Sequence, residues 1–169
     1  MRYETRRAYA VRITAYALMI VLALALQNAL PPAAHVRPQL LIVTVAVAAM
    51  FHGPHTGGTV GFFCGLLADW LSVHTVVFHT VVLMLIGALF GLIADYSLRK
   101  TLPSAYFAAV ITLAVTRLLY VAVFILARGR AGLGVLISVT VPEILYSLAL
   151  LPLFYFPARA VYRMKKRKG

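Results

Sequence analysis

Long apolar runs, separated by short polar or proline-containing links, dominate this chain of 169 residues. The runs cover residues 13–30, 38–52, 56–71, 76–96, 105–126 and 135–156. An α-helix of about 20 apolar residues is long enough to cross a bilayer. The pattern therefore predicts an all-α, polytopic membrane protein: a compact bundle of six transmembrane helices that forms one domain over residues 1–169.

The second run is short for a straight span. It ends at His52-Gly53-Pro54-His55, which reads as a turn because Gly and Pro interrupt regular structure. Two interpretations remain open. The run is either a tilted span, or one arm of a hairpin with the third run that stops before the far side of the membrane.

Composition supports the membrane assignment. Hydrophobic residues make up 63% of the chain and the mean hydropathy is +0.93, both well above the values of soluble domains. Lys and Arg outnumber Asp and Glu by 16 to 4, but the basic residues gather at the ends of the apolar runs. This distribution indicates membrane orientation and contact with anionic lipid, and it argues against a nucleic-acid partner because no soluble domain remains to bind one.

The basic residues also predict sidedness. With six spans and an internal N-terminus, the outer links carry only Arg37, Arg128 and Arg130, whereas both chain ends and the link at Arg99 and Lys100 are basic. Both termini are therefore expected in the cytoplasm. The first run is interpreted as an uncleaved span rather than a signal peptide. The tail 159–169 is expected to contact anionic lipid through Arg163, Lys165, Lys166, Arg167 and Lys168.

A stripe without side chains marks the third run. Gly57, Gly61, Gly65 and Asp69 lie four residues apart, on one face of a helix. Each glycine would destabilise a helix in water by roughly 1 kcal/mol, but in lipid the missing Cβ lets another helix approach closely. The stripe is therefore predicted to be a docking surface for a partner helix, closed by a carboxylate that is one of only four acidic groups.

The fourth run repeats this spacing at Gly87, Gly91 and Asp95. An inverted repeat, such as transporters use, would give such a match. Coincidence between two helices rich in small residues is the simpler interpretation, because the match covers few residues.

Two charges fall inside the last two runs. Arg117 and Glu143 lie at matching depths, roughly 16 and 14 Å from the link that joins their helices. An unpaired charge at that depth costs at least about 2.5 kcal/mol, so an intramembrane ion pair is expected. Its simplest role is to fix the register of the two helices; a ligand or proton site and an interaction hot spot are the alternatives.

The sequence gives little support for a metal site, a disulfide or a catalytic site. The five histidines are spread over the chain without a Cys or acid to complete a metal site, and the single Cys64 excludes an intrachain disulfide. No nucleophile, base and orienting group occur together. We expect no metal, no cofactor and no catalytic residue.

Part of the second and third runs resembles the signature of the rod shape-determining protein MreD family. The matching residues are Pro38-Gln39-Leu40-Leu41-Ile42-Val43, Gly53-Pro54, Gly57-x3-Gly61-Phe62-x2-Gly65-Leu66-Leu67-x-Asp69-x2-Ser72, and Pro142-Glu143 in the last run. The resemblance implies a non-enzymatic scaffold subunit of the elongasome, the cell-elongation machinery for peptidoglycan synthesis, in the bacterial inner membrane. Such a subunit binds the bitopic protein MreC and is linked indirectly to the MreB filament and the peptidoglycan synthases.

Two competing functions stay open at this point. The family resembles, at fold level, the six-helix substrate-binding subunits of vitamin transporters, which would imply a polar pocket near Arg117 and Glu143. An intramembrane enzyme would need polar residues beside Asp69 or Glu143 that the sequence does not supply.

Overall fold

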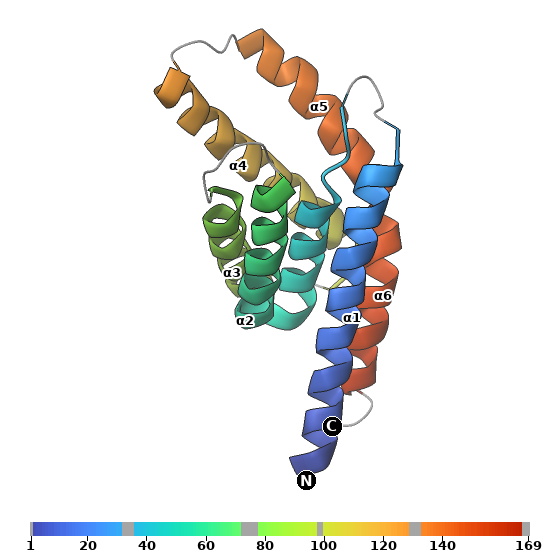
Figure 1. Ribbon diagram of the computed structural model, residues 1–169. Helices are drawn as coiled ribbons and strands as arrows, with labels where there is room; N and C mark the ends of the chain where they lie inside the picture. Colours follow the sequence, from blue (N-terminus) through green and yellow to red (C-terminus); the bar gives the residue numbers. More distant parts are fainter. Residues whose placement is uncertain (1, 32–35, 72–77, 98–99, 129–132, 167–169) are drawn as a thin grey trace.

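The structure, a computed structural model, describes residues 2–31, 36–71, 78–97, 100–128 and 133–166. Its elements are α1 (Arg2–Ala29), α2 (Leu40–Leu71), α3 (Phe78–Ser97), α4 (Leu102–Arg128), α5 (Leu133–Ala149) and α6 (Leu151–Lys166). In Figure 1, α1 and α6 lie side by side, with the start of α1 and the end of α6 at one end of the molecule. The end of α4 and the start of α5 lie at the opposite end. The predicted all-α fold is confirmed for the described residues.

Helix α2 consists of two arms, because Gly53 interrupts it with φ 79° and ψ −170°. Positive φ suits a residue without Cβ, and Pro54 suits the first turn of the helix that follows. A Cβ on Gly57 would lie 2.7 Å from the Ala49 Cβ, although residues eight apart on a continuous helix are about 12 Å apart. The second arm (54–71) therefore folds back along the first arm (40–52), and the turn expected at residues 52–55 is present.

The first arm is the centre of the bundle. All twelve residues from Leu40 to Phe51 are buried. The arm's neighbours are α1, α3, α4 and α6 as well as the second arm. A helix that is apolar on every side is typical of such a buried position. The shortness of the second run thus reflects a core helix that is enclosed by the chain's own helices.

The last apolar run is bent. We expected one span over 135–156, but α5 ends at Ala149 and α6 begins at Leu151, with 47° between the segments on either side. Pro152 has no N–H to continue the helical ladder, and the Leu153 amide instead donates to the Leu150 carbonyl at 3.2 Å. Helix α6 then continues to Lys166, so most of the expected tail is helical.

Length and composition identify fewer spans than the six we expected. Four described helices are long and apolar enough to cross a membrane, and the bent α5–α6 pair brings the number to five. The remaining difference lies in residues 40–71, which count as one helix by this criterion although Gly53 divides them.

Four elements meet where α2 turns. The Tyr16 hydroxyl lies 2.7 Å from His52 Nδ1, and the His52 and Tyr162 rings lie 5.9 Å apart. Lys100 Nζ donates to the Phe51 carbonyl at 3.2 Å and sits 4.4 Å from the centre of the Tyr162 ring, a cation–π geometry. We call this group the turn cluster; it joins α1, α6 and the α3–α4 link to the end of the first arm.

Candidate functional site

The predicted docking stripe is in contact with α3 of the same chain. A Cβ added to Gly57, Gly61 or Gly65 would collide with the α3 backbone. The colliding backbone atoms belong to Gly87, Leu83 and Thr80, respectively. The second arm of α2 and α3 are therefore packed backbone against backbone.

Helix α3 contributes glycines to the same contact. A Cβ on Gly87 would collide with the Gly57 carbonyl, and a Cβ on Gly91 would meet the backbone of Gly53 and Pro54. The repeated Gly-x3-Gly spacing thus forms two facing rows on antiparallel helices, which we call the glycine seam. Close approach of this kind brings many atoms into van der Waals contact, the main attraction between helices in lipid.

One expectation about the site must be corrected. We expected Gly57, Gly61 and Gly65 to receive a helix from another protein, but α3 occupies that surface. The glycines do lie at a close helix–helix contact, as the sequence pattern predicted. The sequence pattern did not indicate that the covering helix would come from the same chain.

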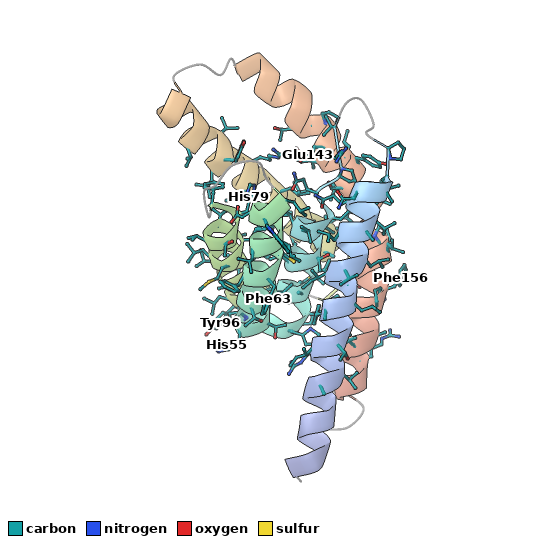
Figure 2. All side chains as sticks on the ribbon, in the orientation of Figure 1. His55, Phe63, His79, Tyr96, Glu143 and Phe156 are labelled. Carbon is teal, nitrogen blue, oxygen red and sulfur yellow. The ribbon has the colours of Figure 1, made fainter. Side chains whose placement is uncertain are left out.

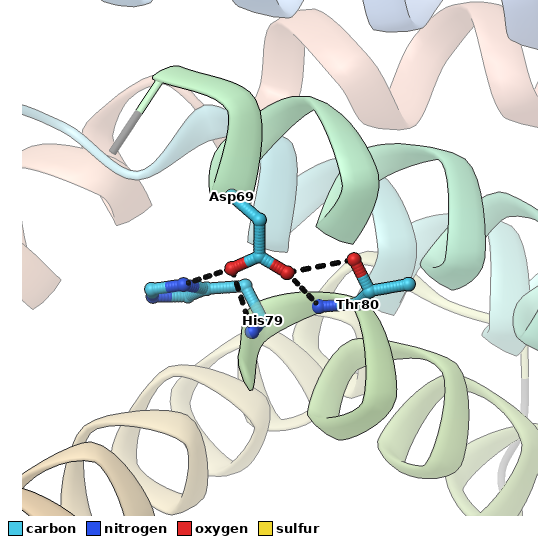
Figure 3. Close-up of polar contacts among 3 residues, drawn as sticks. All are labelled: Asp69, His79 and Thr80. Carbon is cyan, nitrogen blue, oxygen red and sulfur yellow. Dashed lines mark hydrogen bonds and ion pairs between the residues drawn. The ribbon is translucent and has the colours of Figure 1, made fainter. Parts of the chain in front are cut away.

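Asp69 closes the seam by capping α3 (Figure 3). Its Oδ1 accepts the backbone N–H of His79 and the His79 Nδ1–H, both at 2.9 Å. Its Oδ2 accepts the Thr80 N–H at 2.8 Å and the Thr80 hydroxyl at 2.7 Å. The first N–H groups of a helix have no partner within it, and a carboxylate there also interacts favourably with the helix dipole. Asp69 is therefore an N-cap supplied by a neighbouring helix.

Asp95 occupies the corresponding place at the other end of the seam. Its carboxylate lies against Gly53, where a Cβ would collide with it, and its Oδ1 lies 3.9 Å from Lys100 Nζ. The two acids that end the repeated patterns thus lie at opposite ends of the antiparallel pair. Asp69 meets the start of α3, and Asp95 meets the start of the second arm of α2.

Arg117 of α4 and Glu143 of α5 form an ion pair through Nη2 and Oε1. The Glu143 side chain is 1% exposed and that of Arg117 is 24% exposed. Figure 2 places Glu143 where α5 approaches the rest of the bundle. The guanidinium compensates a carboxylate that would otherwise be buried without a counter-charge.

The Ser147 hydroxyl attaches the same part of α5 to the start of α2 by hydrogen bonds to backbone groups. The Ser147 hydroxyl donates to the Glu143 carbonyl at 2.7 Å and accepts the Gln39 N–H at 2.8 Å. Glu143 Oε2 is buried and has no hydrogen-bond partner among the described residues. Together, the ion pair and Ser147 hold α5 against both α4 and α2.

Two of the described histidines make structural contacts, whereas His55 is exposed. His52 belongs to the turn cluster and His79 to the Asp69 cap. Within the part of the chain that the structure describes, no three His, Cys, Asp or Glu side chains come together as metal ligands would. His35 and His74 lie outside it.

The basic tail is described only in part. Arg163 is exposed on α6, and Lys165 and Lys166 belong to the last turn of that helix. Arg167 and Lys168 lie outside the described residues.

Sequence analysis missed His79 and Thr80 as the partners of Asp69. The available signal was weak: an acid near the end of one helix, with a polar pair at the start of the next, ten residues later. It also missed the turn cluster, whose members are far apart in the chain.

Comparison with known families gives one result. The family model described as rod shape-determining protein MreD matches residues 5–165, nearly the whole chain. No curated protein and no solved structure matches.

The glycine seam predicts different effects for two glycine positions on the second arm of α2. Gly61→Ala places a Cβ 2.8 Å from the Leu83 carbonyl carbon and should cost about 1–3 kcal/mol through overpacking. Gly58→Ala is the control, because its Cβ would be 3.5 Å from the Ala88 Cβ, an ordinary contact, and should be neutral or mildly stabilising. Thermal unfolding can be followed in detergent by modification of the single, buried Cys64. Equal stability of the two variants would contradict the seam.

The Asp69 cap predicts that Asp69→Asn destabilises the protein by about 1–3 kcal/mol. An amide presents one acceptor oxygen, so its NH₂ group would face donors of His79 or Thr80. Asp95→Asn should cost less than about 1 kcal/mol, because the Asp95 carboxylate is 46% exposed and its ion pair is long. The Cys64 modification assay measures both, and a larger effect at Asp95 would refute this ranking.

Glu143 is more deeply buried than Arg117. Removal of one or the other charge is therefore expected to lower the free energy of unfolding by different amounts. Arg117→Gln leaves an enclosed carboxylate without a counter-charge and should cost about 3–5 kcal/mol. Glu143→Gln should cost less, because the part-exposed guanidinium can reach polar surroundings. The double variant should recover much of the Arg117→Gln loss, and a double-mutant cycle measures that coupling. Additive losses would show that the two charges do not interact.

Proposed function

Because the chain belongs to the MreD family of rod shape-determining proteins, we propose that it is a non-enzymatic scaffold subunit of the bacterial cell-elongation machinery. It resides in the inner membrane with both termini in the cytoplasm and binds the bitopic protein MreC. Through MreC it is linked to the MreB filament and the peptidoglycan synthases. The observation that carries this proposal is the family match over residues 5–165.

The geometry supports a structural role for the polar groups. Asp69 caps a helix, Arg117 and Glu143 connect two helices, and His52 joins the turn cluster. Each of these polar groups is engaged in packing the chain's own helices. The chain would act by presenting helix surfaces to other proteins, with Arg163, Lys165, Lys166, Arg167 and Lys168 contacting anionic headgroups.

The MreC contact is proposed on the outward faces of the bundle, since the glycine seam is filled by α3. These faces are apolar; on α4, for example, Leu118 and Val123 are exposed. A transmembrane helix can pack there by van der Waals contact without displacing any helix of the bundle. The family match gives no support to the transporter interpretation.

Affinity purification of the tagged full-length chain from membranes of its own bacterium tests the proposal. We expect MreC to co-purify, whereas a transport function would bring an energising ATPase instead. Gly58→Ala is the matched control, because its added Cβ would make only ordinary contacts with Ala88 and Met84 of α3 and would not disturb the seam. A chain that retains its thermal stability but never co-purifies with MreC would overturn the proposed function.

A further inference from the structure

We propose that Arg159 of α6 and Lys100 of the α3–α4 link bind the phosphate group of an anionic phospholipid in the inner leaflet. This inference rests on the proposed function, which places both termini, and therefore the end of α6, in the cytoplasm. The site differs from the headgroup contacts expected of the basic tail, because it lies between two parts of the bundle and includes a residue outside that set.

The Arg159 guanidinium carries a charge that no described acid compensates. Arg159 belongs to the candidate membrane span that ends at Arg163, about 6 Å from that end. Among the residues that the structure describes, its guanidinium contacts only the Tyr155 ring, whose centre lies 5.8 Å from Cζ. A charge at this depth is costly unless it reaches a counter-charge or water. The part-exposed guanidinium therefore suits an anion that approaches from the headgroup layer.

A second cation lies against the same group of aromatic rings. Tyr155 and Tyr162 are seven residues apart on α6, so they share a helix face on which Arg159 lies between them. Both tyrosine rings pack on the Phe51 ring, with centres 5.4 and 5.6 Å from it. Lys100 Nζ lies 4.4 Å from the centre of the Tyr162 ring and donates to the Phe51 carbonyl. Two cations around one aromatic group repel each other, and a shared anion removes that repulsion.

Asp95 compensates one of these charges in part. Its Oδ1 lies 3.9 Å from Lys100 Nζ, and its side chain is 46% exposed. It forms no ion pair with Arg159. The three groups together therefore keep a net positive charge. Because the Lys100 side chain is 28% exposed and Arg159 is part-exposed, a headgroup can reach both cations.

The two cations suit a phosphate in different ways. The planar guanidinium of Arg159 can donate two parallel N–H bonds to phosphate oxygens, whereas the Lys100 ammonium acts as a compact point charge. Basic sites between helices on the cytoplasmic side are typical positions for anionic headgroups. A zwitterionic lipid brings its own cation to the same place, so an anionic lipid should bind more tightly.

The surface beside Arg159 fits a phosphate that carries acyl chains. Leu153 and Phe156 are 47% and 59% exposed, and Ala160 continues this apolar stripe along α6. Figure 2 shows Phe156 on the side of α6 that faces away from α3. Arg159 follows Phe156 by three residues, nearly one turn. An acyl chain can therefore lie along the stripe while its phosphate reaches Arg159, a contact that a soluble phosphate does not make.

Thermal unfolding of the full-length protein in detergent, followed by modification of Cys64, tests this inference. Phosphatidylglycerol added to the micelles should raise the unfolding temperature more than phosphatidylcholine does. Equal effects of the two lipids would overturn the site. Equal protection by inorganic phosphate at the same concentration would overturn the assignment to a lipid, because the acyl chains would then contribute nothing.

Charge variants locate the effect, each compared with the same variant without lipid. Arg159→Gln should raise the phosphatidylglycerol concentration that gives half of the protection by at least about threefold. Arg159→Lys keeps the positive charge and should lose less. Arg37→Gln is the matched control, because it removes an exposed arginine before the start of α2, at the opposite end of the first arm from Phe51. Equal responses of Arg159→Gln and Arg37→Gln would refute the site.

Co-purification of MreC with the same variants separates the two proposals. If MreC co-purifies and phosphatidylglycerol gives no added protection, only the lipid site is wrong. If the lipid protects through Arg159 and MreC does not co-purify, the proposed MreC partnership is wrong instead.

Discussion

The contact between the glycine rows of α2 and α3 is the constraint on which the rest of the structure depends. Without Cβ atoms at Gly57, Gly61 and Gly65, the second arm of α2 lies directly on the backbone of α3. Dispersion forces fall steeply with distance, so this close approach replaces the hydrophobic attraction that lipid cannot provide. Any larger side chain in the seam would separate the helices and weaken the contact along its whole length.

The seam also determines where the polar groups lie. Because the helices are antiparallel and closely packed, Asp69 reaches the unpaired amides at the start of α3. Asp95, at the other end of the seam, lies against Gly53 where the second arm begins. The antiparallel geometry supplies the buried Asp69 carboxylate with partners at the start of α3, whereas the more exposed Asp95 carboxylate pairs with Lys100. Cap and seam therefore depend on each other.

Around this pair the remaining helices enclose the first arm of α2. Twelve consecutive buried residues place that arm at the centre, and the turn cluster attaches α1, α6 and the α3–α4 link to its end. The ion pair of Arg117 and Glu143 connects α4 with α5, while Ser147 connects α5 with the start of α2. Among the described residues, the large apolar side chains left on the outside belong mainly to α1, the second arm of α2, α3 and α4, as membrane exposure requires.

The sequence by itself determined the class of the protein and its family. The length of the apolar runs predicted helices in a membrane, and Gly53-Pro54 predicted the turn. The glycine and acid spacing indicated the MreD resemblance that the family comparison confirms. These features follow from local rules of backbone geometry and solvation, which act within a few residues.

Only the tertiary structure decided what covers the glycines. A stripe of small residues specifies close approach by a helix, and the same stripe would serve α3 or a foreign helix equally well. The sequence likewise did not identify the partners of Asp69 or the members of the turn cluster, because these contacts also depend on which helices become neighbours. Spacing along one helix describes the shape of its face, whereas the neighbour that meets that face depends on how the whole chain packs.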